Sequence, residues 1–177
     1  MRVLLLRHAA TAGNLQHRYI GTTDEPLSPE GKESLAALHF PKPELLVCSP
    51  LRRCIETAAI VFPGEPYLTE PDFRECDFGD FEGKSYADLN GDLRYQAWID
   101  SGGTLPFPHG EAPADFQSRC TSAFSELLQQ HPDIRYMALV VHGGTIMSIL
   151  SARLGGDYYD YQLPNAGYEW LEIDQKR

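Results

Sequence analysis

The sequence predicts an α/β protein, a three-layer α/β/α sandwich with a mainly parallel central sheet and a small helical and loop lid. Two observations predict this fold. Three short apolar runs, at residues 3–6, 45–48 and 138–141, have the length and composition of strands buried on both faces. Stretches with helical periodicity separate these runs, and strands that alternate with helices form parallel sheets covered by helices on both sides.

The helices between the strands begin at recognisable capping residues. Ser28-Pro29 and Ser49-Pro50 each place a serine N-cap before a proline at the first helical position. The expected helices cover residues 28–39, 49–62, 113–131 and 145–154. A last strand is expected at residues 168–173.

The middle of the chain is irregular and is expected to form the lid. Residues 72–83 have the composition of a loop, and two short helices are expected at 85–90 and 92–100. The lid insertion covers about 84–111 within a single domain of residues 1–177. Its aromatic residues either line a substrate pocket or pack as a small cluster of their own: Tyr86, Tyr95, Trp98 and Phe107.

Composition and charge exclude some partners. The 177 residues carry a formal net charge of −10 and a pI near 4.9, which argues against nucleic acid, since a nucleic-acid-binding surface is basic. A small anionic partner is compatible, because a few arginines can make a local positive site in an acidic protein. No apolar stretch has the length of a membrane span or of a signal-peptide core, so no membrane partner is expected. The sequence leaves the oligomeric state open.

The four cysteines are not spaced like metal ligands. None belongs to a CxxC pair, and three lie inside apolar patterns, where a free cysteine behaves as a small hydrophobic residue. We expect reduced core thiols in a cytoplasmic protein that binds no metal. The four residues are Cys48, Cys54, Cys76 and Cys120.

Chemistry-bearing residues follow each of the three expected parallel strands. Arg7-His8 follows the first strand, Ser49 with Arg52 follows the second, and His142 follows the third. Because the carboxyl ends of parallel strands meet at one edge of a sheet, we expect these side chains and two helix N-termini to converge. Arginine forks and helix N-termini bind oxyanions, so the sequence predicts a phosphate site.

Glu75 adds a carboxyl group to this chemistry. It lies just before a loop rich in aromatic residues and glycine, at residues 78–83. A carboxyl group beside a phosphate is driven towards its protonated form by the like charge. Glu75 would then donate a proton to a leaving alkoxide and later accept one from water.

Five motifs stand in a fixed order along the chain. They are RHAATAGN at 7–14, GTTD at 21–24 followed by PLSPEG at 26–31, SPLRRC at 49–54 with TA at 57–58, FRECDFGDFEG at 73–83, and VHGG at 141–144. In this order they resemble the histidine phosphatase superfamily, which contains cofactor-independent phosphatases and cofactor-dependent phosphoglycerate mutases. The resemblance runs from residue 1 to about residue 170.

The resemblance implies a role for each site residue. His8 would attack phosphorus and become phosphohistidine, and Glu75 would act as general acid and then as general base. The phosphoryl oxygens would be held by Arg7, Arg52, His142, Asn14, the backbone N–H of Gly143 and, as an additional contact, Thr11. No metal and no cofactor is implied, since the arginines neutralise the charge that Mg²⁺ neutralises elsewhere. Arg53 is expected to cover the helix surface with its stem.

Two positions depart from the pattern of that family. The third residue of the first motif is usually glycine and here is Ala9, which resists positive φ and close backbone approach. Residues 109–112 read His-Gly-Glu-Ala where relatives often have Gly-Gly-Glu-Ser. Loss of the serine hydroxyl is expected to alter the far side of the pocket.

The expected function is a metal-independent phosphatase acting on a small phosphorylated metabolite. The short chain and the sequence FGDFE at 78–82 most resemble the α-ribazole phosphatase branch, which removes phosphate from α-ribazole 5′-phosphate in cobalamin biosynthesis. A cofactor-dependent phosphoglycerate mutase is an alternative, although such mutases carry an insertion after the acid motif that this chain lacks. A phosphoester-binding module without catalysis is a third alternative, and it would need neither His8 nor Glu75.

Overall fold

The computed structural model describes residues 1–174 and contains one five-stranded sheet. The strands are β1 (Arg2–Arg7), β2 (Leu45–Cys48), β3 (Leu68–Thr69), β4 (Tyr136–Val141) and β5 (Tyr168–Glu172). Their order is β3-β2-β4-β1-β5, and every neighbouring pair is parallel except β1 with β5. The three apolar runs are therefore adjacent inner strands, and the predicted α/β fold is confirmed. The short edge strand β3 was not predicted, because two exposed residues carry no periodic signal.

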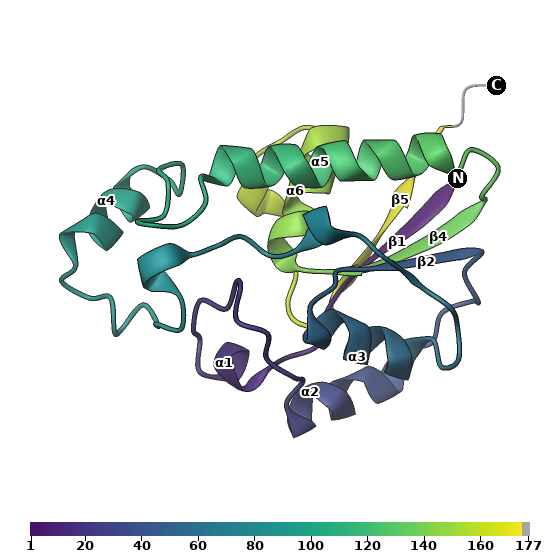
Figure 1. The fold of residues 1–177 in the computed structure, drawn as a ribbon, viewed down its shortest axis with the longest axis horizontal. Helices are drawn as coiled ribbons and strands as arrows, with labels where there is room; N and C mark the ends of the chain where they lie inside the picture. Colours follow the sequence, from purple (N-terminus) through teal and green to yellow (C-terminus); the bar gives the residue numbers. More distant parts are fainter. Residues whose placement is uncertain (175–177) are drawn as a thin grey trace.

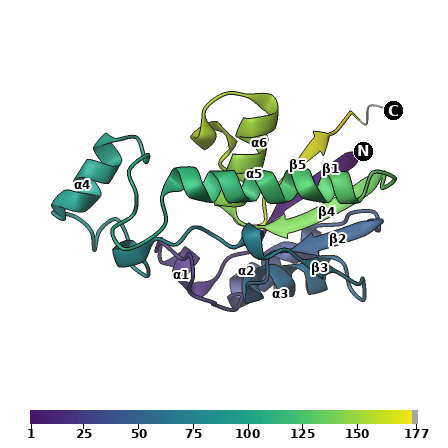
Figure 2. The ribbon, with the colours of Figure 1, turned by 45° about the horizontal axis from the view of Figure 1, so that its top comes forward.

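Helices cover both faces of the sheet (Figure 1). On one side lie α5 (Pro113–Gln130) and α6 (Gly143–Leu154), and on the other lie α2 (Pro29–Ser34) and α3 (Arg52–Val61), as Figure 2 shows from a second direction. Among residues 1–174, no helix is both long and apolar enough to cross a membrane.

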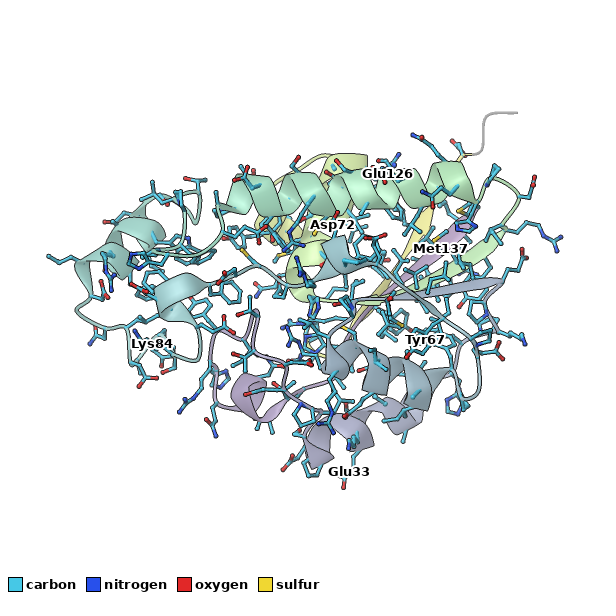
Figure 3. All side chains as sticks on the ribbon, viewed as in Figure 1. Glu33, Tyr67, Asp72, Lys84, Glu126 and Met137 are labelled. Atoms are coloured by element: carbon cyan, nitrogen blue, oxygen red, sulfur yellow. The ribbon has the colours of Figure 1, made fainter. Side chains whose placement is uncertain are left out.

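Alternate residues of β1 pack against the helical layers on the two faces of the sheet. Val3 and Leu5 pack in the cluster that contains α5 and α6, whereas Leu4 and Leu6 pack in the cluster that contains α3. All four side chains are fully buried, and burying one such side chain stabilises the fold by roughly 1.5–3 kcal/mol. Met137 of β4, labelled in Figure 3, is another fully buried member of the first cluster. A sheet with both faces covered explains why these strands read as unbroken apolar runs.

The helix boundaries correct three predictions. Ser28 caps α2 as expected by accepting from the N–H of Gly31, but the α-helix ends at Ser34 and continues only as a 3₁₀ turn to residue 37. Helix α3 begins after Leu51, not at the predicted cap Ser49, because the Ser49 hydroxyl is engaged in the interior. Helix α6 begins at residue 143 rather than 145.

Residues 84–111 stand beyond the sheet at its carboxyl edge (Figure 1). They contain α4 (Leu93–Asp100), close to the expected helix, whereas residues 85–90 form turns instead of a helix. The segment packs on the body through an aromatic cluster, which combines buried Phe81, Phe107 and Phe116 with partly buried Tyr95 and Trp98.

A short helix near the amino terminus, α1 (Ala12–Leu15), was not predicted. Thr11 is its N-cap, and its hydroxyl accepts from the backbone N–H of Asn14. The Asn14 side chain accepts in return from the backbone N–H of Thr11. This reciprocal capping box stabilises a helix of only one turn.

The backbone at Ala9 does not adopt the positive φ that would favour glycine. Outside glycine, positive φ occurs among the described residues only at His17, His109 and Ala166. Ala9 is fully buried and packs with Leu27. The methyl group of Ala9 therefore fills the core without backbone strain.

The close backbone approach in this region occurs at Gly31 of α2. A Cβ atom added to Gly31 would lie 2.1 Å from the carbonyl oxygen of Ala10. The glycine that the loop after β1 requires is therefore in the neighbouring helix, not at position 9.

We predict that Gly31→Ala lowers the free energy of unfolding. Alanine favours a helix by roughly 1 kcal/mol over glycine, but overpacking against a backbone atom costs about 1–3 kcal/mol. The clash should therefore win, and the loss is measured by urea unfolding. Glu33→Ala, on the exposed face of the same helix (Figure 3), is the control and should change stability by under about 0.5 kcal/mol. An unchanged or raised stability for Gly31→Ala would contradict the close approach.

Candidate active site

The ends of three parallel strands meet, as the sequence predicts. His8 follows β1, Ser49 follows β2, and His142 follows β4. The His8 and His142 rings lie edge to face with their centroids 5.1 Å apart. The Ser49 Oγ lies 2.7 Å from Nε2 of His142. The polar residues that end these strands therefore form one cluster at the carboxyl edge of the sheet.

His8 is held in one tautomer. Its Nδ1 lies 2.8 Å from the carbonyl oxygen of Ala9, which can only accept a hydrogen bond. Nδ1 therefore carries the proton, and Nε2 keeps its lone pair. Burial, and then the charges of Arg53 and Arg7, lower the pKa of His8 well below its usual 6.5. The imidazole is thus neutral at physiological pH, as a nucleophile requires.

Arg7 presents an unused donor. One terminal nitrogen of its guanidinium donates to the carbonyl of Leu163, but its Nε is buried and has no hydrogen-bond partner among the described residues. Gly143 permits this position, because a Cβ atom there would lie only 3.3 Å from the guanidinium. A buried N–H without an acceptor costs about 1–3 kcal/mol, so this group is suited to an incoming anion.

The structure places Arg53, not Arg52, beside the two histidines. Arg53 is fully buried, and its Nε donates to Nδ1 of His142 at 3.3 Å. The side chain of Arg52 is 59% exposed and pairs with Glu56 at 2.6 Å on the outer face of α3. The structure therefore corrects both predicted positions, since Arg53 was expected on the helix surface and is buried beside His142, whereas Arg52 was expected at the phosphate and lies on the exposed face.

The sequence contains a signal that would have separated the two arginines. Arg52 and Glu56 are four residues apart and oppositely charged, which is typical of a solvated helix face. Arg53 shares the spacing of four with Thr57, whose side chain is also fully buried. The periodicity of α3 thus turns Arg53 inward.

His142 is a neutral hydrogen-bonding centre. Its Nδ1 accepts from Arg53, so the ring proton lies on Nε2 and is donated to the Ser49 hydroxyl. Burial first, then Arg53 and His8, lower the pKa of His142 well below 6.5. Ser49 thereby orients a functional ring and does not cap α3.

Glu75 lines the same cavity as Arg7 and His8. Its two carboxyl oxygens accept from the backbone N–H of Cys76 at 2.9 Å and of Gly144 at 3.4 Å. Burial raises the pKa of Glu75 above its usual 4.5, although these hydrogen bonds and the charges of Arg53 and Arg7 oppose the change. The protonated acid therefore persists to higher pH than in an exposed glutamate.

A guanidinium from α5 clamps the backbone around Glu75. Arg119 donates to the carbonyls of Asp72, Arg74 and Glu75 at 2.6–3.2 Å. It also forms a two-pronged pair with the carboxylate of Glu111 at 2.7 and 2.9 Å. The position of the acid is thus set by contacts distant from it in sequence.

Other predicted phosphate contacts have mixed positions. Asn14 lines the cavity beside His8, and so does Gly143 at the first turn of α6. Thr11 is fully buried, does not line the cavity, and uses its hydroxyl as the cap of α1. Asn165, which was not among the predicted contacts, also lines the cavity and donates to the carbonyl of His8 at 3.2 Å.

The two expected helix N-termini are not equally open. The first turn of α6 borders the cavity through Gly143 and Gly144. At α3 the backbone N–H of Arg52 donates to the carboxylate of Asp24 at 2.6 Å, so this end is already occupied. One helix N-terminus rather than two therefore faces the site.

The cavity has a volume of about 490 Å³. Arg7, His8 and Glu75 line it together with further polar residues, namely Asn14, His17, Arg18, Gln162 and Asn165. Its aromatic and apolar lining includes Tyr19, Phe78, Tyr86, Trp98, Phe107, Phe116, Met147, Tyr158 and Tyr159. Of the aromatic residues in 84–111, Tyr86, Trp98 and Phe107 line the cavity, whereas Tyr95 packs behind them, stacked on Trp98 at 6.1 Å.

The departure at residues 109–112 affects a helix end rather than the cavity. Ala112 is the N-cap of α5 and has no side-chain cap hydrogen bond, so the missing hydroxyl is a missing cap. His109 is exposed and pairs with Asp80, and neither His109 nor Ala112 lines the cavity. The expected change on the far side of the pocket is therefore wrong.

The thiols lie in the core as predicted. All four cysteines are buried and unpaired, and burial raises the pKa of the Cys48 thiol to about 12. Within residues 1–174, no group of three or more histidine, cysteine or acidic residues is arranged to hold a metal ion.

Comparison with known proteins places this arrangement in a family. Residues 3–177 match the profile of the histidine phosphatase superfamily (branch 1). The chain is 32% identical to a glucosyl-3-phosphoglycerate phosphatase of Mycolicibacterium vanbaalenii, over 87% of this chain and 74% of that protein. It is 28% identical to the adenosylcobalamin/α-ribazole phosphatase of Escherichia coli K12, over 99% of this chain and 92% of that protein.

A solved structure has a closely similar fold. The crystal structure of the α-ribazole phosphatase from Shigella flexneri superimposes with a TM-score of 0.88 at 25% sequence identity. The superposition covers 99% of this chain and 92% of that chain.

We predict that the two neighbouring arginines differ sharply in anion binding. Arg53→Lys should weaken the binding of inorganic phosphate by about tenfold or more, because a lysine cannot reproduce the fork that holds His142 and adds its charge to the site. Arg52→Lys, the matched control on the exposed face, should change the dissociation constant less than about twofold. Isothermal titration calorimetry measures both constants. Equal effects at the two positions would contradict the placement of Arg53.

Proposed function

We propose that this chain, which belongs to branch 1 of the histidine phosphatase superfamily and is a phosphatase, hydrolyses small phosphate monoesters through a phosphohistidine on His8. One observation carries the proposal. The bond between Nδ1 of His8 and the Ala9 carbonyl leaves Nε2 with a free lone pair in a cavity that also holds Arg7. A binding module would need no such nucleophile.

In the first step, Nε2 of His8 forms a bond to phosphorus while the ester P–O bond breaks. The carboxyl proton of Glu75 passes to the leaving alkoxide, so an alcohol departs and Glu75 becomes a carboxylate. The raised pKa of Glu75 supports this role, because it keeps the proton available for donation. His8 then carries the phosphoryl group.

In the second step, water attacks phosphorus of the phosphohistidine and the P–N bond breaks. The Glu75 carboxylate accepts a proton from that water, inorganic phosphate leaves, and His8 returns to its neutral form. Each group is then ready for another turnover, so Glu75 acts first as acid and then as base.

Charge neutralisation comes from the protein itself in this proposal, without a metal or cofactor. The Nε of Arg7, which has no hydrogen-bond partner within residues 1–174, would donate to a phosphoryl oxygen. Buried Arg53, which donates to His142, adds a second positive charge. Asn14 and the backbone N–H of Gly143 border the same space. Thr11 contributes indirectly, since it caps the helix that contains Asn14.

The proposed mechanism predicts a trapped intermediate in Glu75→Gln. With p-nitrophenyl phosphate, whose leaving group needs no proton, phosphorylation should proceed while dephosphorylation slows about 10²–10⁴-fold. An acid-labile, base-stable phosphoenzyme should accumulate, as detected by mass spectrometry in the presence of EDTA. With an alkyl phosphate, wild-type turnover should fall as pH rises through the raised pKa of Glu75, and the variant should lack this dependence.

His8→Asn is the control for the trapped species and should form none. A phosphoryl group found on a residue other than His8 would refute the phosphohistidine mechanism. Normal turnover by His8→Asn would refute it as well. Loss of wild-type activity in EDTA would refute the absence of a metal requirement.

For the physiological substrate we propose α-ribazole 5′-phosphate, and we propose that residues 84–111 act as a lid over it within a single domain. The aromatic lining supports this choice, since α-ribazole carries a flat apolar base on ribose. The similarity over 99% of the chain to the α-ribazole phosphatase of E. coli supports it as well. The four unpaired buried thiols fit a cytoplasmic location.

Substrate choice is predicted to depend on Trp98. Truncation by Trp98→Ala should lower kcat/KM for α-ribazole 5′-phosphate by about tenfold or more, yet change kcat/KM for glycerol phosphate less than about threefold. A panel that includes glucosyl-3-phosphoglycerate ranks the competing substrates. Higher kcat/KM for that ester would overturn the choice, and interconversion of 2- and 3-phosphoglycerate would favour a mutase.

A further inference from the structure

Loop 20–24 lies between two charged side chains. On one side, the terminal nitrogens of Arg53 donate to the carbonyls of Ile20, Gly21 and Thr23 at 3.3, 2.9 and 2.8 Å. On the other side, one carboxylate oxygen of Glu82 accepts from the backbone N–H groups of Gly21 at 2.8 Å and Thr23 at 3.0 Å. The loop thus connects a carboxylate to a buried guanidinium.

The peptide between Ile20 and Gly21 makes the connection direct. Its carbonyl accepts from Arg53, and its N–H donates to Glu82. A peptide that is hydrogen-bonded at both ends in this sense is polarised, which strengthens both bonds. Moving the carboxylate therefore moves or weakens the acceptor that Arg53 uses.

The loop cannot adjust freely to a change on either side. A Cβ atom at Gly21 would lie 2.0 Å from the carbonyl oxygen of Cys76, directly after the acid Glu75. Backbone hydrogen bonds from Gly83 to Tyr19 at 2.8 Å and from Tyr19 to Lys84 at 3.0 Å join the same two segments. The carboxylate of Glu82 extends this pairing by two further bonds.

Arg53 has no direct ion pair that would orient it instead. Across residues 1–174, no carboxylate lies within ion-pair distance of its guanidinium, although the side chain is fully buried. A buried charge normally requires a partner or several hydrogen bonds. Here the carbonyls of loop 20–24 supply those bonds, and Glu82 holds the loop that supplies them.

We propose that Glu82 is a positioning residue for the phosphate site, acting through loop 20–24 to orient Arg53 and, through Arg53, His142. The proposal rests on the proposed function for the meaning of that site. Among the described residues, Glu82 neither lines the cavity nor forms a hydrogen bond with His142, so sequence position alone would not assign it this role. The feature that matters is the hydrogen-bond acceptor at Glu82, which glutamine also possesses.

The test compares Glu82→Ala with Glu82→Gln. Alanine removes the acceptor for both N–H groups, so inorganic phosphate should bind about tenfold or more weakly, and kcat/KM for p-nitrophenyl phosphate should fall by a similar factor. Glutamine retains a carbonyl oxygen, so both quantities should stay within about threefold of the wild type. Glu44→Ala is the matched control. Its carboxylate accepts a backbone N–H from Arg135 at 3.2 Å but lies away from loop 20–24, so both quantities should be unchanged.

A second measurement reports on Arg53 directly. Its Nε–H signal in ¹H–¹⁵N spectra, assigned by its loss in Arg53→Lys, should exchange slowly in the wild type and in Glu82→Gln. The signal should exchange rapidly or vanish in Glu82→Ala, because the bond to His142 loosens. This readout needs neither turnover nor ligand, so it remains informative if the wild type hydrolyses no ester.

Two results would overturn the proposal. In the first, Glu82→Ala loses thermal stability but retains phosphate affinity, kcat/KM and the protected Nε–H signal, which would leave Glu82 a purely structural role. In the second, Glu82→Gln is as impaired as Glu82→Ala, which would exclude the acceptor as the decisive feature. If wild-type protein binds phosphate without hydrolysing any ester, the proposed function fails while the comparison of affinities still tests Glu82.

Discussion

The hydrogen bond between Nδ1 of His8 and the carbonyl of Ala9 connects the fold to its chemistry. This hydrogen bond determines which nitrogen of the imidazole carries the proton. Because its acceptor is a backbone carbonyl, the bond requires the Ala9 backbone to be held in place. That backbone is held from two directions. Its N–H donates to the hydroxyl of Thr57 on α3 at 3.1 Å, and the following residue packs against Gly31 of α2. Two helices and one strand thus orient a single ring.

Burial decides the electrostatics of the site. The protein is acidic overall, yet the carboxyl edge of the sheet contains buried Arg53 and partly buried Arg7. Their charges act in the same direction as desolvation on the two histidines, so both imidazoles stay neutral. At Glu75 desolvation raises the pKa and outweighs the charges of the two arginines, which lower it. The carboxyl group therefore keeps its proton to higher pH. A neutral imidazole therefore lies in the same positive site as a carboxyl group whose pKa is raised.

The errors in the sequence-based prediction have a common physical origin. The dipeptide Ser49-Pro50 is typical of a helix start. In the structure, however, the Ser49 hydroxyl forms a hydrogen bond with Nε2 of His142 at 2.7 Å instead of capping a helix. Arg52 and Arg53 are adjacent, and their positions were predicted wrongly although the spacing of four between Arg52 and Glu56 is typical of the exposed face of a helix. The contacts of Arg119, Glu111 and Glu82 were not predicted, because each side chain acts on a backbone segment distant in sequence. Local propensities depend on residues that are neighbours along the chain. They carry no information about contacts between segments that only folding brings together.

Local patterns in the sequence were sufficient to predict four of the five strands, most of the helices, the mainly parallel sheet and the edge at which His8, Ser49 and His142 gather. Apolar periodicity and capping residues are local properties, and the carboxyl ends of parallel strands always share an edge. Tertiary contacts were needed to show that Arg53 is buried against His142, which nitrogen of His8 is free, and that position 9 does not require glycine. Those outcomes depend on single hydrogen bonds and on the rotation of one helix, where a shift of one residue along α3 changes a buried contact into a solvated one.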